Sequence, residues 1–130
     1  MNAITVSVIW LAALYLAFVI KHFAADFLFQ TNWMAIGKEQ SRGWLAPLAT
    51  HAGIHGALTL VLMLTLQPSL WWLGPIDFVI HGVIDRLKGL ATRRFGLTQK
   101  DARWWWLLGL DQALHALTHF SYILALLLAR

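Results

Sequence analysis

The sequence predicts an all-α fold, in which four transmembrane helices pack antiparallel as a single integral-membrane domain over residues 1–130. Composition is the first observation: 59% of the residues are hydrophobic and only 12% are charged, about half the charged share of an ordinary soluble domain. The second is that the apolar residues gather in four segments, each near the roughly 20 residues that cross a bilayer. The third is that basic residues cluster in two of the connections between these segments.

The four apolar segments are expected at residues 4–29, 45–66, 70–90 and 104–128. The first segment lacks the positive residues that begin a signal peptide, since no charge precedes Lys21, and we expect it to remain as a helix. Gly74–Pro75 favours a late start for the third helix. That start would leave the third segment short and either tilted or partly re-entrant.

The charges of the connections predict the orientation. The connection at residues 31–44 carries Lys38 and Arg42, and the connection at residues 86–103 carries six basic residues. The connection at residues 67–69 is uncharged, and only Arg130 marks the C-terminal end. Because basic loops stay in the cytoplasm, both termini are predicted to face outward from a bacterial inner membrane. With a net charge of +4 on so apolar a chain, we expect the basic residues to face anionic lipid and not nucleic acid.

Polar side chains recur every fourth residue in all four segments, so they line one side of each helix. The stretch "DQALHALTHF" (residues 111–120) is the clearest case. Counted inward from the predicted cytoplasmic ends, polar pairs from the four helices reach a common depth of about 8–17 Å. A polar core near the cytoplasmic side is therefore predicted. The stripes are His22, Asp26 and Gln30; His51 and His55; Asp77, His81 and Asp85; and Asp111, His115 and His119.

These stripes predict a metal site, because neutral imidazole and carboxylate suit zinc, iron and manganese. Side chains on facing helices commonly hold metals in bundle cores. Eight candidates exceed the four ligands of a closed zinc site, so we expect one or two divalent metals, with zinc favoured over iron or manganese. Thiolate ligands are excluded because the chain has no cysteine. The expected ligands are His22, Asp26, His51, His55, His81, Asp85, Asp111 and His115.

Four other polar residues are expected beside the ligands, where such groups orient them: Gln30, Gln112, Asp77 and His119. Asp77 has a second interpretation as a carboxylate at a helix N-terminus, and His119 as a packing residue one turn deeper. Lys21 lies off the stripes, and we expect its ammonium to extend to the membrane surface. The structural alternative for the whole set is that polar contacts between helices only hold the bundle together.

Four motifs resemble the bacterial and phage membrane-protein family labelled domain of unknown function 3307. They are "HFAADFLFQTNWMAIGK" (residues 22–38), "HAGIH" (51–55), "HGVIDRLK" (81–88) and "DQALHALTH" (111–119). The resemblance covers residues 17–128, and the combination of motifs is more specific than any one of them. It implies a small multi-span membrane protein without an assigned activity, and it implies that Gln30, Lys38 and Lys88 belong to the family motif.

The function predicted from these residues is a membrane-embedded, metal-dependent hydrolase, acting on a lipid-like or phosphate-bearing substrate near the cytoplasmic leaflet. Lys38, Arg86 and Lys88 are expected at the cytoplasmic rim, where they could hold a phosphate or headgroup. Their alternative role is to set the orientation alone, and for Arg86 we favour it. An aspartate that is not a ligand would act as the base, and the sequence does not identify which.

Three alternatives stay open at this point. A membrane di-iron oxidase or hydroxylase would use the same residue types, although such enzymes usually have a larger share of histidine. A carrier of divalent metal or protons would need access from both faces, whereas the polar residues favour one half of the membrane. An interaction protein, including a homo-oligomer, would use the polar core only for assembly. Membrane lipid and a divalent metal are the expected partners.

Overall fold

The computed structural model describes residues 7–129 as helices joined by short connections, and no strand occurs among them. The all-α prediction is therefore confirmed. Residues 4–6 of the first predicted segment and Arg130 lie outside the described residues. The elements in chain order are α1 (Val8–Phe23), the π-helix η1 (Ala24–Leu28), α2 (Asn32–Gly37), α3 (Leu45–Leu66), the 3-10 helix η2 (Pro68–Leu70), α4 (Leu73–Arg94) and α5 (Ala102–Leu128).

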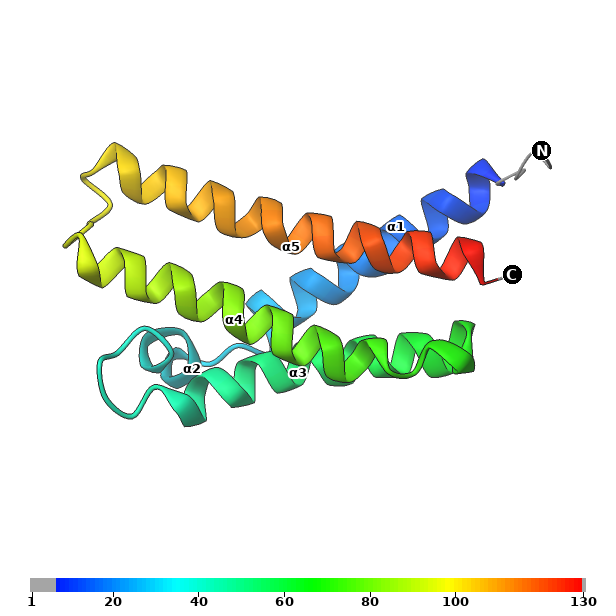
Figure 1. The fold of residues 1–130 in the computed structure, drawn as a ribbon, viewed down its shortest axis with the longest axis horizontal. Helices are drawn as coiled ribbons and strands as arrows, with labels where there is room; N and C mark the ends of the chain where they lie inside the picture. The colour runs from blue at the N-terminus through cyan, green and yellow to red at the C-terminus, as the bar shows by residue number, and fades with distance from the viewer. Residues whose placement is uncertain (1–6, 130) are drawn as a thin grey trace.

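The long helices α1, α3, α4 and α5 alternate in direction along the chain (Figure 1). The pair α3 and α4 packs along its length, α5 contacts α4, and α1 crosses at a slant against α5 and α3. The connections at residues 38–44 and 95–101 lie at one end of the molecule, and the first and last described residues lie at the other (Figure 1). We call these the connection end and the terminal end.

Two glycines allow α3 and α4 to approach closely. A Cβ atom added at Gly56 would lie 3.0 Å from the carbonyl oxygen of Gly74, and one added at Gly74 would lie 2.7 Å from the Cβ of Leu60. Helix α4 begins at Leu73, so Pro75 falls in its first turn, where a missing N–H costs nothing. Helix α4 has 22 residues, and the expectation of a short third segment was wrong.

The predicted connection at residues 31–44 contains the short helix α2, which the sequence analysis missed. Thr31 begins it as the N-cap, and its side-chain oxygen accepts a hydrogen bond from the backbone N–H of Met34. Helix α2 packs on α3, where Gly37 lies directly against Pro47. This contact leaves no room for a side chain at position 37.

The interior changes from apolar to polar between the two ends. Toward the terminal end, seven buried residues form one apolar cluster: Leu14, Phe18, Met63, Leu73, Tyr122, Ile123 and Leu126. Toward the connection end, the buried residues include most of the histidines and aspartates of the stripes. The outer surface has the opposite character, because large apolar side chains such as Val61, Val83 and Leu117 are more than half exposed.

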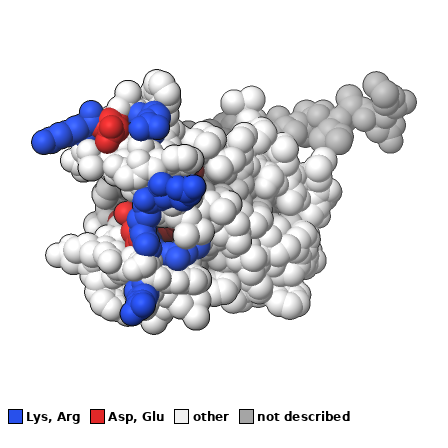
Figure 2. All heavy atoms as spheres, turned by 60° about the vertical axis from the view of Figure 1, so that its left-hand side comes forward, with Lys and Arg blue, Asp and Glu red and all other residues white. Residues whose placement is uncertain are grey.

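Two helical stretches are long and apolar enough to cross a membrane, judged by length and composition alone: Val8–Leu28, which combines α1 and η1, and α3. Figure 2 brings the connection end forward and shows lysine and arginine gathered there, while most of the remaining visible face is uncharged. Helices α4 and α5 are as long or longer, at 22 and 27 residues.

Candidate metal centre

The polar stripes of four elements meet inside the bundle. Asp26 comes from η1, His51 and His55 from α3, His81 and Asp85 from α4, and His115 from α5. These six residues form two groups, in each of which one ligand atom per residue lies within 4.8 Å of the others. We call the two groups together the candidate metal centre.

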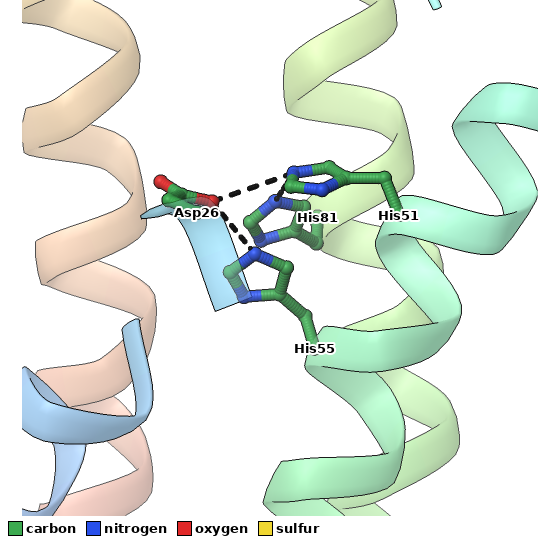
Figure 3. A group of neighbouring side chains, drawn as sticks. All are labelled: Asp26, His51, His55 and His81. Carbon is green, nitrogen blue, oxygen red and sulfur yellow. Dashed lines mark hydrogen bonds and ion pairs between the residues drawn. The ribbon is translucent and has the colours of Figure 1, made fainter. Parts of the chain in front are cut away.

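The first group consists of Asp26, His51, His55 and His81 (Figure 3). Asp26 Oδ1 lies 2.8 Å from His55 Nε2 and 3.4 Å from His51 Nε2. The Nε2 atoms of His51 and His81 are 3.3 Å apart. All three imidazoles are fully buried and pack on one another, with ring centroids of His55 and His81 only 3.5 Å apart. Three ring nitrogens and one carboxylate oxygen thus converge on a single point.

The second group consists of His81, Asp85 and His115, so His81 is common to both groups. Asp85 Oδ2 lies 3.7 Å from His81 Nε2 and 3.4 Å from His51 Nε2. The other oxygen of Asp85, Oδ1, lies 3.7 Å from His115 Nε2. The two groups are close enough for one metal that draws on both or for two metals that share His81.

The ring of His115 is oriented as a metal ligand requires. Its Nδ1 lies 2.8 Å from the backbone carbonyl oxygen of Asp111, and a carbonyl can only accept, so Nδ1 carries the proton. In the neutral ring Nε2 then has a free lone pair. This Nε2 is buried and has no hydrogen-bond partner among the described residues. A cation at this point would satisfy a polar atom that the protein leaves unpaired.

The π-helix η1 positions Asp26. The backbone N–H of Phe29 donates to the carbonyl of Ala24, five residues earlier, at 2.9 Å, which widens the helix by one residue. The helical segment then ends at Leu28, so Gln30 lies in the connection between η1 and α2. Gln30 therefore does not continue the stripe of His22 and Asp26 as predicted; its side chain folds back and donates to the Asp26 carbonyl at 3.1 Å.

Two of the eight expected ligands, His22 and Asp111, lie beside the two groups but not within them. His22 Nε2 contacts the second oxygen of Asp26 at 3.0 Å and Gln112 Oε1 at 3.4 Å. The side chain of Gln112 also donates to Asp111 Oδ2 at 3.0 Å. Asp111 Oδ1 is buried without a hydrogen-bond partner among the described residues. Gln112 therefore connects the two residues at the edge of the centre.

Lys38 lies deeper than a residue at the membrane rim. Its ammonium donates to Asp85 Oδ2 at 2.7 Å and to Gln30 Oε1 at 3.0 Å. Its side chain is mostly buried. Lys38 thus contacts a ligand of the candidate centre directly, a role that its position in a predicted loop did not reveal.

Lys88 and Arg86 lie farther out. Lys88 pairs with Glu39 at 3.4 Å, and both side chains are partly exposed. The guanidinium of Arg86 stacks on Trp44, 3.9 Å from the ring centroid, and donates to the backbone carbonyl of Gln40 at 3.0 Å. Arg86 therefore fixes the connection after α2, a role that the sequence analysis did not predict.

A cavity of about 140 Å³ opens onto the candidate metal centre. Its lining is mostly polar, and it gives Asp85, His115 and Asp111 a common space with the two lysines. The lining residues are Asp26, Phe27, Gln30, Lys38, Asp85, Lys88, Asp111, Gln112 and His115.

A second buried polar layer lies nearer the terminal end. Lys21 Nζ is 2.7 Å from Asp77 Oδ2 and 3.2 Å from His119 Nε2. Asp77 also accepts hydrogen bonds from Thr59 at 2.6 Å and Tyr122 at 3.3 Å. The expectation that Lys21 extends to the membrane surface was wrong, because its side chain is almost completely buried.

Asp77 and His119 both lie in this deeper layer, and neither belongs to a candidate metal group. His119 packs on Phe18 with ring centroids 5.3 Å apart, as a packing residue would. His119 also packs on His22, with ring centroids 5.3 Å apart. Thr59 was missed entirely, because a lone threonine in an apolar segment gives no sequence signal.

A family profile described as "Protein of unknown function (DUF3307)" matches residues 14–129 of this chain. No curated protein and no solved structure matches this chain.

Proposed function

The chain belongs to the DUF3307 family of proteins of unknown function, and from its own geometry we propose that it is a membrane-embedded, metal-dependent hydrolase. Its substrate would be a lipid-like or phosphate-bearing molecule near the cytoplasmic leaflet. The metal would be one or two divalent ions, with zinc favoured by the mixture of imidazole and carboxylate.

The charge balance of the buried site carries the metal proposal. Three carboxylates, those of Asp26, Asp85 and Asp111, lie in and around the candidate centre with the ammonium of Lys38. The second lysine of the cavity, Lys88, is paired with Glu39 and adds no net charge. With neutral imidazoles, three negative charges and one positive charge leave a formal −2. Such an imbalance costs several kcal/mol per unpaired ion in a protein interior. A divalent cation would cancel it and would also bind the unpaired Nε2 of His115.

The distribution of apolar surface supports a membrane location. Large apolar side chains are exposed around the outside, whereas most of the histidines and aspartates are buried within. Helices α4 and α5 are long enough to span a bilayer, and part of their lower hydropathy comes from interior residues such as His81, Asp85 and His115. We propose four spans, with the basic connection end in the cytoplasm of a bacterium and both termini outside.

The residues of the site would have different roles in hydrolysis. A bound metal would polarise the scissile bond and make a nearby water more acidic. Asp111 is the best candidate for the base, because it lines the cavity, lies outside both metal groups and keeps one oxygen unpaired. Lys38 holds Asp85 in place, and Lys88 lies at the cavity wall where it could contact a phosphate oxygen.

A carrier of metal or protons is disfavoured by the interior of the terminal half. Leu14, Met63, Ile123 and Leu126 fill that half, and each is nearly or fully buried. An ion moving from the candidate centre to the outer face would have to cross this apolar cluster. A hydrolase needs access from one side only.

The metal is tested by a matched pair of variants, His81→Gln and His119→Gln. Both histidines are buried in helices, but only His81 belongs to the candidate metal groups. We expect detergent-purified protein to contain zinc or a related metal, His81→Gln to lose most of it, and His119→Gln to retain it. Equal metal content in both variants, or wild-type protein that neither contains nor takes up metal, would overturn the proposal. Iron with an absorption band of an oxidised centre would favour the di-iron alternative.

Hydrolysis is tested in phosphatidylcholine vesicles that contain phosphatidic acid or phosphatidylglycerol, with products identified by mass spectrometry. We expect products that disappear on chelation, return with added zinc and are absent with His81→Gln. Metal-loaded protein that leaves these lipids and a water-soluble phosphate ester unchanged would refute hydrolase activity.

A further inference from the structure

We propose that a groove between α1 and α5 holds the apolar chain of the substrate while the polar cavity holds its headgroup, so that one amphiphilic lipid occupies both. This assignment rests on the proposed function and specifies its substrate class as a membrane lipid that enters sideways from the bilayer. The groove has a volume of about 260 Å³.

The groove has an apolar wall and a partly polar floor. Its rim consists of aromatic side chains that are half or more exposed, including Phe23 and Phe120. Phe23 and Phe27 stack along one edge with ring centroids 5.4 Å apart. Buried Phe18 and Ile123 form the lower wall. A surface of this kind can hold an acyl chain without a desolvation cost, because a chain that passes from the bilayer into the groove stays in apolar surroundings and gains packing contacts there.

Two residues join the groove to the cavity. Phe27 and Gln112 line both spaces, so the groove and the cavity at the candidate metal centre are direct neighbours. His22 lies in the groove as well and contacts Asp26, a member of the first metal group, at 3.0 Å. Neither an apolar chain alone nor a soluble phosphate alone would use both spaces, whereas a lipid with a polar headgroup would.

The position of the groove agrees with entry from the membrane. One of its walls is α1, which together with η1 forms one of the two stretches apolar enough to span a bilayer. The other wall is α5, whose exposed Leu117 and Leu124 present an apolar outer surface. Helix α1 crosses α5 at a slant (Figure 1). A lipid tail could therefore lie between them without leaving the hydrocarbon layer.

The test uses photo-crosslinking in phosphatidylcholine vesicles that contain a phosphatidic acid with a diazirine on one acyl chain. Ala116 lines the groove, and Ala113 lies on the same helix outside it; both are exposed. We expect adducts to concentrate on Phe23, Phe27 and Phe120. The variant Ala116→Trp should reduce these adducts by roughly tenfold, since it fills the space that the chain would occupy, while Ala113→Trp leaves them unchanged.

Adducts spread evenly over all exposed apolar faces, including Val61 and Val83, would indicate surrounding lipid only and would overturn the inference. Equal effects of the two tryptophan variants would do the same. Crosslinking does not require hydrolysis of the lipid, so its result tests the groove independently of the hydrolase proposal. If the protein hydrolyses a water-soluble ester in a metal-dependent manner but the adducts are spread evenly, the groove assignment is wrong and the hydrolase proposal is supported. If the adducts concentrate in the groove but no metal binds, the chain site stands and the hydrolase fails.

Discussion

Removing the charge of Lys21 should destabilise the protein far more than removing the charge of Lys88. In Lys21→Met, Asp77 loses the ammonium at 2.7 Å and remains as a carboxylate that is 1% exposed. It keeps only the neutral donors Thr59 and Tyr122. Breaking a buried ion pair in this way costs about 3–5 kcal/mol. At 1.4 kcal/mol per factor of ten, the ratio of folded to unfolded protein should fall by about two to nearly four powers of ten.

The matched control is Lys88→Met. Lys88 pairs with Glu39 at 3.4 Å, with both side chains partly exposed, so this pair should contribute less than about 1 kcal/mol. The assay is reversible unfolding in mixed micelles of a mild detergent and dodecyl sulfate, followed by far-ultraviolet circular dichroism. The free energy of unfolding is compared between each variant and the wild-type protein.

The double variant Lys21→Met/Asp77→Leu separates the charge pair from simple packing. It removes both buried charges, leaves the hydroxyls of Thr59 and Tyr122 without their acceptor and takes the Lys21 partner from His119, at about 1 kcal/mol each. We therefore expect the double variant to be more stable than Lys21→Met alone. A cost for Lys21→Met no larger than that of Lys88→Met, or a double variant whose cost is the sum of the single ones, would refute the reasoning.

Three further predictions concern packing, catalysis and orientation. Gly56→Ala should cost about 1–3 kcal/mol, because its Cβ would lie 2.8 Å from a side-chain carbon and 3.0 Å from a carbonyl oxygen of α4; Gly53→Ala, which meets nothing within 4 Å, should be nearly neutral in the same unfolding assay. Asp111→Asn should keep metal stoichiometry within a factor of two while lowering turnover by about 10²–10⁴-fold, as loss of a general base does; loss of metal instead would make Asp111 a ligand. A cysteine at Gln99 should react with an impermeant thiol reagent only from the cytoplasmic side and a cysteine at Ala129 only from the outer side, and the reverse pattern would invert the proposed orientation.

The sequence was sufficient for the four long helices and for much of the candidate centre. The second predicted segment coincides with α3, Leu45–Leu66, because a mainly apolar run between two polar connections defines both ends of a helix. His51 and His55 face the interior together, because residues four apart share a side of an α-helix. Agreement in depth added the partners from the other helices, which no single stripe could supply.

The errors arose where the backbone departs from a regular α-helix or where a contact is long-range. A spacing of four residues placed Gln30 on the stripe of Asp26. The π-turn of η1 adds one residue, and the helix ends before Gln30. No residue type marks such a turn, and the extra residue is visible only in the hydrogen bond. Lys38 was read as a loop residue because the sequence does not show that α2 folds back beside Asp85.

Lys21 and Asp77 show why a shared stripe does not define a shared site. Asp77 and Asp85 lie on the same face of α4 but are eight residues apart, which is about 12 Å along the axis. Asp85 therefore reaches the candidate metal centre, whereas Asp77 meets Lys21 in the deeper layer. The deeper pair is neutral without an ion, whereas the outer layer has a formal excess of two negative charges when its imidazoles are neutral. Depth assigns each carboxylate to a layer, and the charge that remains in that layer distinguishes a structural ion pair from a site that could hold a divalent cation.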